Sequence, residues 1–374
     1  MNRFYLLQML GTPCVRARKI ISMASSEFDV TYLGVKRSIE DVSNDDVIHL
    51  GVPIRRGSYG KIFFQFFYFL HAVFVLVKKK PKVVYAADFD AGIPAFLYKL
   101  IVRKNVFFVY DVLDTYADRY KVPKIVSNAL RWLECSVARC ADLVVHVDKI
   151  RIQTLPVKLK QVLIVRNLPM LKDLPGSVIN RREVAGSEDK IKVLFSGGVF
   201  WHRGLSQIVE AIRIIKEKYA QDVALDVIGY GGDSEIEFLK QNSDICNYHG
   251  VVTSKEALEF SARSDFLVAL YSPDSEINRL ACPNKVYDAF YTGIPIILNR
   301  ELYISAGFEG YKNVVVASYD NPEEIADNLY GAFLRQDEVF LFGMELSERW
   351  LKGCSWESEF EAVIREVKGG VCIE

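Results

Sequence analysis

Two cations stand at points of the sequence where a folded chain can bind an anion. Lys285 follows Asn284, and Arg203 follows a glycine pair, Gly197 and Gly198. Each segment comes shortly after an apolar run of the kind that forms a buried strand. Positive charge, bare backbone N–H groups and a helix N-terminus attract phosphate oxygens together. The two segments therefore predict a binding site for a pyrophosphate.

The elements around Lys285 decide whether this lysine can serve in that way. Residues 266–270 are typical of a buried strand, a helix is expected to begin near Pro283 and to end at Gly293, and residues 294–298 form a second buried strand. Proline suits a helix N-terminus and glycine suits the C-cap. A lysine in the first turn opposes the helix dipole, which makes sense if an anion binds there. An ordinary strand–loop–helix–strand unit with a solvated lysine is the alternative.

The polar residues of this loop favour the binding site over that alternative. Asn278, Arg279, Asn284 and Lys285 follow a strand, and open α/β sheets bind ligands at the carboxyl ends of their strands. Asp288 comes three residues after Lys285 and shares its helix face. We therefore predict that this group contacts the ligand.

The segment that contains Arg203 repeats the arrangement. An apolar run, 191–195, leads into the glycine pair and then into an amphipathic helix that extends to residue 219. A glycine pair lets the backbone approach a pyrophosphate, and arginine can bind its oxygens in bidentate fashion. Turns also follow two more predicted strands, at residues 229–232 and 250–252. Glycine pairs are frequent, so this segment alone is a weak indication.

Two runs of residues resemble a known family. PNKVYDAFYTGIPII (283–297) is similar to the donor-binding segment of retaining GT-B glycosyltransferases, glycosyltransferase family 4 in particular, and GGVFWHRGL (197–205) resembles the phosphate loop of that family. The resemblance implies two Rossmann-like α/β domains that face each other across a cleft. It also implies that Arg203 and Lys285 meet the donor diphosphate and that Asp288 meets the ribose. The implied donor-binding residues are Gly197, Gly198, Arg203, Gly204, Tyr230, Gly250, Val251, Asn278, Asn284, Lys285 and Asp288.

The chain departs from the family pattern at two positions. The family commonly has two glutamates eight residues apart, and here Leu280 stands at the first position and Asp288 at the second. YDVLDTYAD (110–118) resembles the Y-D-x-H-E segment of many relatives, with Leu113 in place of the histidine. These replacements leave the roles of the first glutamate and of the histidine vacant.

Acidic residues mark the strand ends of the first half. Asp88, Asp111 and Asp114 each follow a predicted strand, so they are expected at one edge of a sheet. A carboxylate there could accept a proton from an acceptor hydroxyl, although strand-end acids also serve as helix caps. The resemblance places the acceptor near the loop of Gly11. The candidate catalytic residues are Arg203, Lys285, Asp111 and Asp88, and the acceptor-side residues are Gly11, Asp88, Asp111 and Asp114.

Composition indicates a globular protein with unequal halves. With 374 residues, two domains are expected. Residues 1–172 carry 27 Lys and Arg against 14 Asp and Glu, whereas the remainder carries 20 against 33. A basic first half suggests an anionic partner, or an attraction between the two halves across a cleft. Seven scattered cysteines without a C-x-x-C motif indicate a reducing compartment and no zinc site.

Residues 59–80 form a strongly aromatic segment that ends in Lys78, Lys79 and Lys80. Its apolar run is shorter than the roughly 20 residues that a membrane span needs. Aromatic surface beside cations suits a helix that lies in an anionic membrane interface. The alternative is a crossover helix that packs on the sheet, with a basic C-terminus that suits its dipole. We expect a helix that is partly buried and partly faces lipid.

The predicted domains are an acceptor-side domain at 1–170, a linker at 171–189, a donor-binding domain at 190–345, and helices at 346–374 that cross back to the first domain. The predicted activity is transfer of a sugar from a nucleotide-diphosphate sugar to a lipid-linked or other saccharide acceptor with retention, in bacterial surface polysaccharide assembly. We infer no metal or other cofactor and no nucleic-acid partner. We expect no signal peptide, and a cytoplasmic protein that is peripheral on the inner face of the membrane. The alternatives are a nucleotide-sugar epimerase of the same fold and a non-catalytic GT-B partner subunit.

Overall fold

The computed structural model describes residues 1–36, 43–51, 58–102, 105–116, 122–174 and 190–371. The chain divides into two compact units, which we call unit 1 and unit 2. Unit 1 comprises Met1–Arg166 together with Glu357–Glu374, and unit 2 comprises Asn167–Trp356. The predicted linker lies outside the described residues from 175 onward, and the predicted boundary at 346 falls inside a helix of unit 2.

Unit 1 is built on a parallel sheet of seven described strands in the order β3-β2-β1-β4-β5-β6-β7. The strand β4 has the sequence VVYAA and is buried along its whole length. Such unbroken apolar runs are expected where helices cover both faces of a parallel sheet. The strands are β1 Arg3–Gln8, β2 Asp29–Val35, β3 Val47–Leu50, β4 Val83–Ala87, β5 Phe107–Val112, β6 Leu143–His146 and β7 Val162–Ile164.

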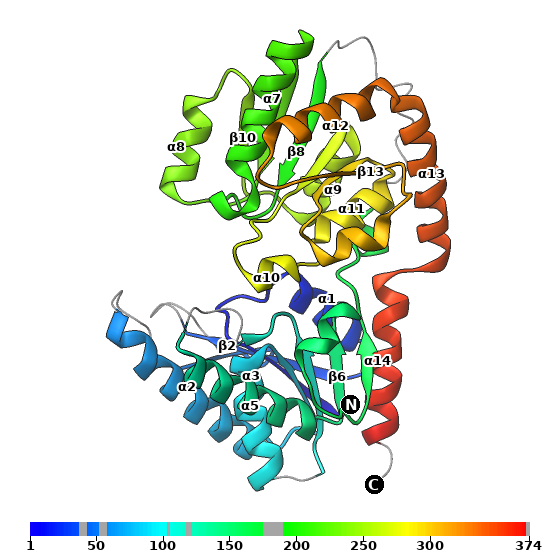
Figure 1. Cartoon of the computed structure of the whole chain (residues 1–374). Coiled ribbons are helices and arrows are strands. Elements are labelled where there is room, and N and C mark those ends of the chain that lie inside the picture. Colours follow the sequence, from blue (N-terminus) through cyan, green and yellow to red (C-terminus); the bar gives the residue numbers. More distant parts are fainter. Residues whose placement is uncertain (37–42, 52–57, 103–104, 117–121, 175–189, 372–374) are drawn as a thin grey trace. The chain divides into compact units, whose positions relative to one another are not determined.

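Figure 1 shows α2, α3 and α5 side by side on one face of this sheet. The C-terminal helix α14 belongs to the same unit, and Arg166 and Glu359 form an ion pair within it. Phe360 of this helix also lies against Tyr85 of β4, and their ring centroids are 6.2 Å apart. This separation falls in the range of about 4.5–7 Å that aromatic pairs prefer. The helices are α1 Val15–Ala24, α2 Ser58–Lys79, α3 Phe89–Leu97, η1 Tyr98–Val102, α5 Lys124–Cys140, η2 Ile150–Thr154 and α14 Trp356–Val371.

Unit 2 holds a second parallel sheet, in which the six described strands follow the order β10-β9-β8-β11-β12-β13. The first strand, β8, lies at the centre of the sheet; β9 and β10 extend the sheet on one side of it, and β11, β12 and β13 extend it on the other. The strand order therefore reverses between β8 and β11, and α/β sheets bind ligands at such a switch point. The strands are β8 Ile191–Ser196, β9 Val223–Ile228, β10 Cys246–Gly250, β11 Phe266–Ala269, β12 Ile296–Asn299 and β13 Val314–Ala317.

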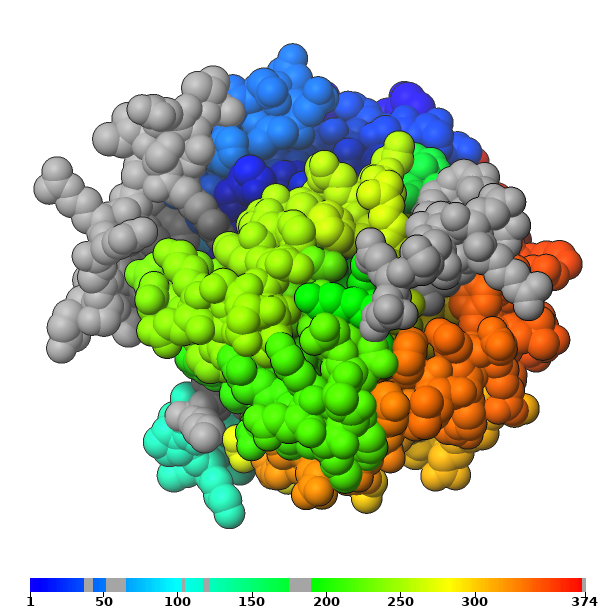
Figure 2. Space-filling model, turned by 90° about the horizontal axis from the view of Figure 1, so that it is seen from above, coloured from blue at the N-terminus to red at the C-terminus, as the bar shows by residue number. Residues whose placement is uncertain are grey.

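The helices α7 and α12 of unit 2 pack together, and Tyr219 stacks on Tyr330 with centroids 4.0 Å apart. Figure 2 shows this pair of helices side by side, α7 in green and α12 in orange. The helical segments of this unit are η3 Leu171–Asp173, η4 Trp201–Arg203, α7 Leu205–Tyr219, α8 Asp233–Gln241, α9 Ser254–Arg263, α10 Glu276–Arg279, α11 Asn284–Thr292, η5 Tyr303–Phe308, α12 Pro322–Leu334 and α13 Gln336–Gly353.

The predicted alternation of strands and helices is confirmed, and the corrections are local. The helix α11 begins where it was predicted, with Pro283 as its N-cap, and Gly293 adopts the predicted left-handed C-cap with a φ of 72°. The strand β3 was not predicted. Helix α3 begins at Phe89 and turns into a π-helix at Tyr98, four residues after Pro94. A proline in a helix removes a backbone N–H and disturbs the hydrogen-bond pattern.

Candidate functional site

The glycine loop after β8 lies against the loop after β9. Gly197 has a φ of +112°, and its N–H donates to the carbonyl of Ile228 over 2.9 Å. A Cβ at Gly229 would lie 1.7 Å from the carbonyl oxygen of Gly197, so only glycine fits at that position. The two loops are thus held by backbone contacts, and a bare stretch of backbone is left at the carboxyl end of the sheet.

Lys285 lies in the first turn of α11, as predicted, and its side chain reaches the glycine loop. A Cβ on Gly197 would lie 3.7 Å from the Cε of Lys285. The Lys285 Nζ also lies 3.2 Å from the Asp288 Oδ2, and both side chains are more than four-fifths buried. The structure therefore brings Gly197 and Lys285 together, which are 88 positions apart in the sequence and were predicted to share one ligand.

Arg203 is held by a residue that the sequence analysis did not single out. Its guanidinium carbon lies 4.0 Å from the centre of the Tyr271 ring, a distance typical of a cation–π contact. The backbone of Tyr271 is in turn fixed by Asn299, which accepts a hydrogen bond from its N–H over 2.8 Å and donates one to its carbonyl over 3.2 Å. Tyr271 directly follows the predicted strand at 266–270, which was the available signal for it.

The loops after β8 and β11 are also joined directly. The N–H of Ser272 donates to the carbonyl of His202 over 2.9 Å. Gly204 has a φ of +77°, and a Cβ there would lie 2.5 Å from the Cβ of Leu270. Arg203 at the end of η4 and Lys285 in the first turn of α11 thus both follow the carboxyl ends of adjacent strands, β8 and β11.

Aromatic and backbone groups surround this point. The Tyr230 side chain is 63% exposed and meets Phe200 edge-on, with ring centroids 5.5 Å apart. The carbonyl of Gly250 accepts the N–H of Gly229 over 2.7 Å, and Val251 beside it is exposed. An exposed ring on a fixed loop can stack on a planar ligand such as a nucleobase.

The remaining predicted donor residues differ in what they offer. Asn284 is exposed at the first position of α11. The amide of Asn278 donates to the carbonyl of Ser272 over 2.9 Å, so it stabilises the loop after β11. A Cβ on Gly198 would lie 2.9 Å from the Phe200 ring. Asn278 therefore acts on the loop that carries Tyr271 at least as much as on any ligand.

The charges at this edge suit a diphosphate. One unit pair of opposite charges 4 Å apart is stabilised by about 4 kcal/mol at an effective dielectric constant near 20. Asp288 balances part of the charge of Lys285, whereas Arg203 contacts an uncharged ring. A bound diphosphate would gain from both cations and from the N–H groups of the glycine loop.

The carboxyl edge of the unit 1 sheet is organised differently, and it corrects the prediction for Asp111. The Asp111 side chain is fully buried and accepts two hydrogen bonds from the Arg16 guanidinium, over 2.7 and 2.9 Å. The Tyr85 hydroxyl donates to it over 2.8 Å, and Arg16 also donates to the carbonyl of Val165. A carboxylate that is enclosed and paired in this way cannot accept a proton from an acceptor, so Asp111 is not a catalytic base.

The ionisation of this buried group follows from its geometry. Burial disfavours the charged form of Arg16, but the carboxylate of Asp111 outweighs this effect and raises the pKa of the guanidinium. Burial and the same carboxylate raise the pKa of Tyr85 well above its ordinary value. The guanidinium of Arg16 therefore stays charged and the phenol of Tyr85 stays neutral throughout the physiological range.

The other acceptor-side residues are less enclosed. Asp88 is half-buried in a left-handed conformation, with a φ of 71°, which few residues other than glycine adopt. Its carboxylate accepts the N–H of Leu113 over 3.3 Å. Asp114 forms an ion pair with Arg151 over 2.9 Å. Backbone strain of this kind gathers at functional sites, so Asp88 stays a candidate.

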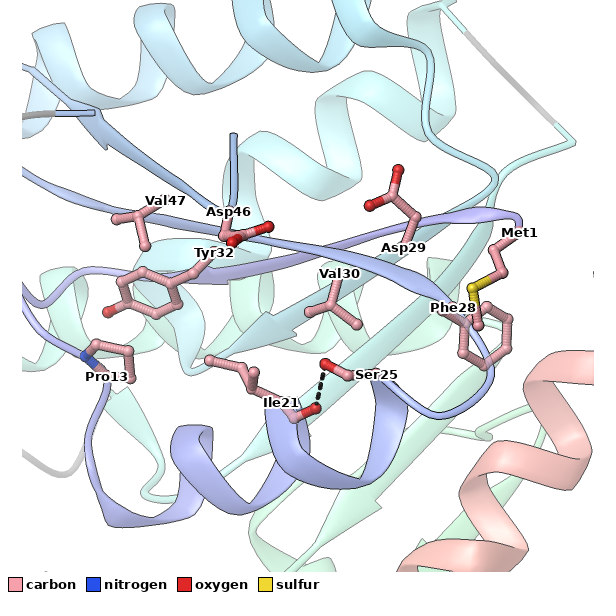
Figure 3. A pocket seen from close by; sticks show the side chains of 10 residues that line it. All are labelled: Met1, Pro13, Ile21, Ser25, Phe28, Asp29, Val30, Tyr32, Asp46 and Val47. Atoms are coloured by element: carbon pink, nitrogen blue, oxygen red, sulfur yellow. Dashed lines mark hydrogen bonds between the residues drawn. The ribbon is translucent and has the colours of Figure 1, made fainter. Parts of the chain in front are cut away.

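The loop of Gly11 is also anchored. The Nε2 atom of His49 lies 3.2 Å from the carbonyl oxygen of Gly11. Close to this loop, a cavity of about 620 Å³ lies between α1 and the strands β2 and β3. Figure 3 shows Ile21 of α1 opposite Val30 and Tyr32 of β2 across it. None of the predicted site residues lines this cavity, and its wall combines apolar side chains with two carboxylates, which gives a phosphate no cation.

The second half of the chain matches a family of known proteins. Residues 190–333 match the family model described as Glycosyl transferases group 1. This range includes both loops that carry Arg203 and Lys285. The chain has the GT-B fold, and the match to the group 1 glycosyl transferase model lies in its second half. The GT-B fold that the resemblance implied is thereby confirmed.

The similarity to solved structures covers nearly the whole chain. The chain is similar to the sucrose-phosphate synthase of Thermosynechococcus elongatus, with a TM-score of 0.76, 13% identity, and coverage of 99% of this chain and 100% of that chain. It is also similar to Anabaena HepE, solved in a complex with UDP and glucose, with a TM-score of 0.70, 13% identity, and coverage of 98% of this chain and 100% of that chain. A glycosyltransferase from Rickettsia africae is similar with a TM-score of 0.70, 11% identity, and coverage of 100% of this chain and 99% of that chain. No curated protein sequence matches the chain.

Proposed function

We propose that the protein transfers a sugar from a nucleoside diphosphate sugar to a lipid-linked saccharide acceptor. The observation that carries the donor half of this proposal is the position of Lys285, whose side chain lies against Gly197 at the carboxyl end of β8. Glycine backbone, a helix N-terminus and a lysine then act on the same anion. The complex of HepE with UDP supports a nucleoside diphosphate as the ligand of this fold.

In this mechanism the protein stabilises the leaving group. Breaking the bond between the sugar and the diphosphate places negative charge on the phosphate oxygens. Lys285 and Arg203 hold positive charge where it develops, and the Tyr271 ring fixes the guanidinium so that little reorganisation is needed. Retention of the anomeric configuration is supported by the resemblance of residues 283–297 to retaining enzymes, and it is tested by following the anomeric proton of the product by NMR.

On the acceptor side, we propose Asp88 as the group that accepts the proton of the attacking hydroxyl. Of the three predicted strand-end carboxylates, Asp88 is the one with a positive φ, and it is half-buried. The basic composition of residues 1–172 supports an anionic acceptor, such as a lipid diphosphate at the inner face of the cytoplasmic membrane, in surface polysaccharide assembly.

The test of this function is transfer of labelled sugar. The purified chain is given nucleotide sugars in turn, with and without a lipid-linked saccharide acceptor. Label in the lipid fraction supports the proposal, and loss of that label in Lys285→Ala assigns it to the site described. Interconversion of the sugar without transfer would instead identify an epimerase. If the chain does not bind, hydrolyse or transfer any nucleotide sugar, it is a non-catalytic subunit. Leu280 and Leu113, which stand where the family has a glutamate and a histidine, are the residues that favour this alternative.

A further inference from the structure

Helix α2 is apolar on two opposite faces, and only one of them packs on the sheet. Tyr68, Ala72, Val75 and Leu76 are buried. Within residues 65–79, the exposed apolar residues are Phe66, Phe67, Leu70, Phe74 and Val77. Positions 66, 70, 74 and 77 recur at helical spacing, so they form one stripe on the side away from the buried residues. A helix that is apolar all round is expected in a core or a membrane environment, and this one lies at the surface of its unit.

The same layer of helices exposes more apolar side chains. The π-helix η1, which continues α3, exposes Leu100 and Ile101, and Ile101 is 74% exposed. The helix α5 exposes Ile125 and Trp132, which are 84% and 70% exposed. Helix α3 packs against both α2 and α5, and Figure 1 shows the three side by side on one face of the sheet. The exposed apolar residues of α2, η1 and α5 therefore belong to one layer, which we call the aromatic layer.

The exposed charges of α2, η1 and α5 have one sign. Lys78, Lys79 and Lys80 are exposed at the C-terminus of α2, and Lys124 is exposed at the start of α5. The sequences of α2, η1 and α5 contain a single acidic residue, Glu134. This residue is fully buried and accepts hydrogen bonds from Tyr110 and from the N–H of Tyr116. The exposed side of these three elements is therefore aromatic, aliphatic and cationic.

We infer that the aromatic layer is the surface on which unit 1 docks to an anionic lipid bilayer. Phenylalanine and tryptophan side chains enter the boundary between headgroups and acyl chains, and the lysines bind the anionic headgroups. A second copy of the chain is disfavoured because two layers with the same charge repel each other. No helix of the described residues is long and apolar enough to cross a membrane.

This inference names the surface for the lipid-linked acceptor proposed above, and in that respect it rests on the proposed function. Docking by α2, η1 and α5 would confine the search for a lipid-linked acceptor to the plane of the membrane. The donor loops of unit 2 take no part in docking, so chemistry and docking can be lost separately.

The test is sedimentation of the full chain with lipid vesicles. Wild type is expected to bind vesicles that contain phosphatidylglycerol and not vesicles of phosphatidylcholine alone. Each cation near an anionic surface contributes about fivefold to binding, so K78E/K79E/K80E is expected to lower the partition at least about tenfold. The matched control reverses three exposed lysines of unit 2, K216E/K240E/K255E, and is expected to bind as wild type does.

The apolar contribution is tested in the same way. F66S/F74S is expected to lower the partition at least about tenfold, whereas L334S/L341S, which changes two equally exposed side chains of unit 2, is expected to leave it unchanged. Quenching of tryptophan fluorescence by brominated lipid is expected to disappear in Trp132→Phe. Donor hydrolysis in solution should persist in K78E/K79E/K80E and vanish in Lys285→Ala, which should still bind vesicles.

Three results would overturn the inference. The first is the absence of binding to anionic vesicles, and the second is equal binding by the variants of α2 and by their controls. The third is a concentration-dependent dimer, or a complex with an acidic protein, that F66S/F74S abolishes while vesicle binding is unchanged. None of these results bears on the proposed transfer reaction, which is tested separately by the transfer of labelled sugar.

Discussion

The two sheets place arginines at their carboxyl edges and use them in opposite ways. In unit 1, Arg16 is enclosed with Asp111 and Tyr85, and its charge is matched by a buried carboxylate. In unit 2, Arg203 is partly exposed on the face of Tyr271, beside glycines. A cation whose charge is already neutralised stabilises the fold, whereas a cation beside an uncharged ring can still bind an anion. The same position in the fold therefore does not imply the same role.

Removing the carboxylate from the unit 1 pair should have the largest effect. Asp111→Ala leaves the Arg16 guanidinium buried without a counterion, which is expected to lower the free energy of unfolding by about 3–5 kcal/mol. Urea denaturation measures it. Asp114→Ala, which breaks the pair of Arg151 with a carboxylate that is 36% exposed, is the control and should cost less than Asp111→Ala. If the two variants were equally stable, the pair would not be the structural element described.

Removing the lysine from unit 2 should affect catalysis and not folding. Lys285→Ala removes one charge that stabilises the leaving diphosphate, so kcat/KM is expected to fall about 10²- to 10³-fold. Steady-state kinetics with the best donor measures this, and the urea midpoint should stay close to that of wild type. Lys255→Ala, an exposed lysine of α9, is the matched control. Full activity of Lys285→Ala would remove the basis of the donor site.

The buried histidine of unit 1 should make that unit sensitive to acid. Burial, together with Arg151 and Arg16, lowers the pKa of His146 from 6.5 to about 3. The unfolded chain binds this proton below about pH 6.5 and the folded chain does not, so stability falls as the pH drops from 6.5 towards 3. The slope from this residue is about 1.4 kcal/mol per pH unit. His146→Gln should reduce the pH dependence of the free energy of unfolding, measured by urea denaturation, by that amount, and an unchanged slope would contradict the assignment.

The smallest effect is expected at the ring that supports Arg203. Tyr271→Leu removes the cation–π contact, so kcat/KM should fall about three- to tenfold. The effect of Tyr271→Leu should vanish when Arg203 is already alanine, because the ring acts through the guanidinium. Kinetics of the two single variants and the double variant measure the coupling. Additive effects would show that Tyr271 acts on its own.

The sequence was sufficient for the parts of the fold that depend on local pattern. Buried apolar runs and the turn residues between them identified most strands and helices, and Gly293 marked the end of α11 correctly. The strand β3 was missed because its four residues include a histidine and are only partly buried. The π-helix η1 depends on how the chain accommodates Pro94, which a periodic pattern does not reveal.

The candidate site was predictable to the extent that its residues lie next to glycines or strand ends. Lys285 and Gly197 could be paired because each stands in a segment with a recognisable role. The role of Asp111 could not be predicted, because its partner Arg16 lies 95 residues away and only the folded chain joins them. Asn299 was equally hidden, since its amide reaches Tyr271 from another strand.

The central claim is that Lys285 and the glycine loop after β8 bind a diphosphate. Isothermal titration calorimetry of wild type and Lys285→Ala with a nucleoside diphosphate, and with the same nucleoside without phosphate, tests it most directly. We predict that wild type binds the diphosphate at least about tenfold more tightly, since a charge-assisted contact is worth about 1.5–3 kcal/mol, and that most of this preference is lost in Lys285→Ala. An equal preference in both proteins would contradict the account.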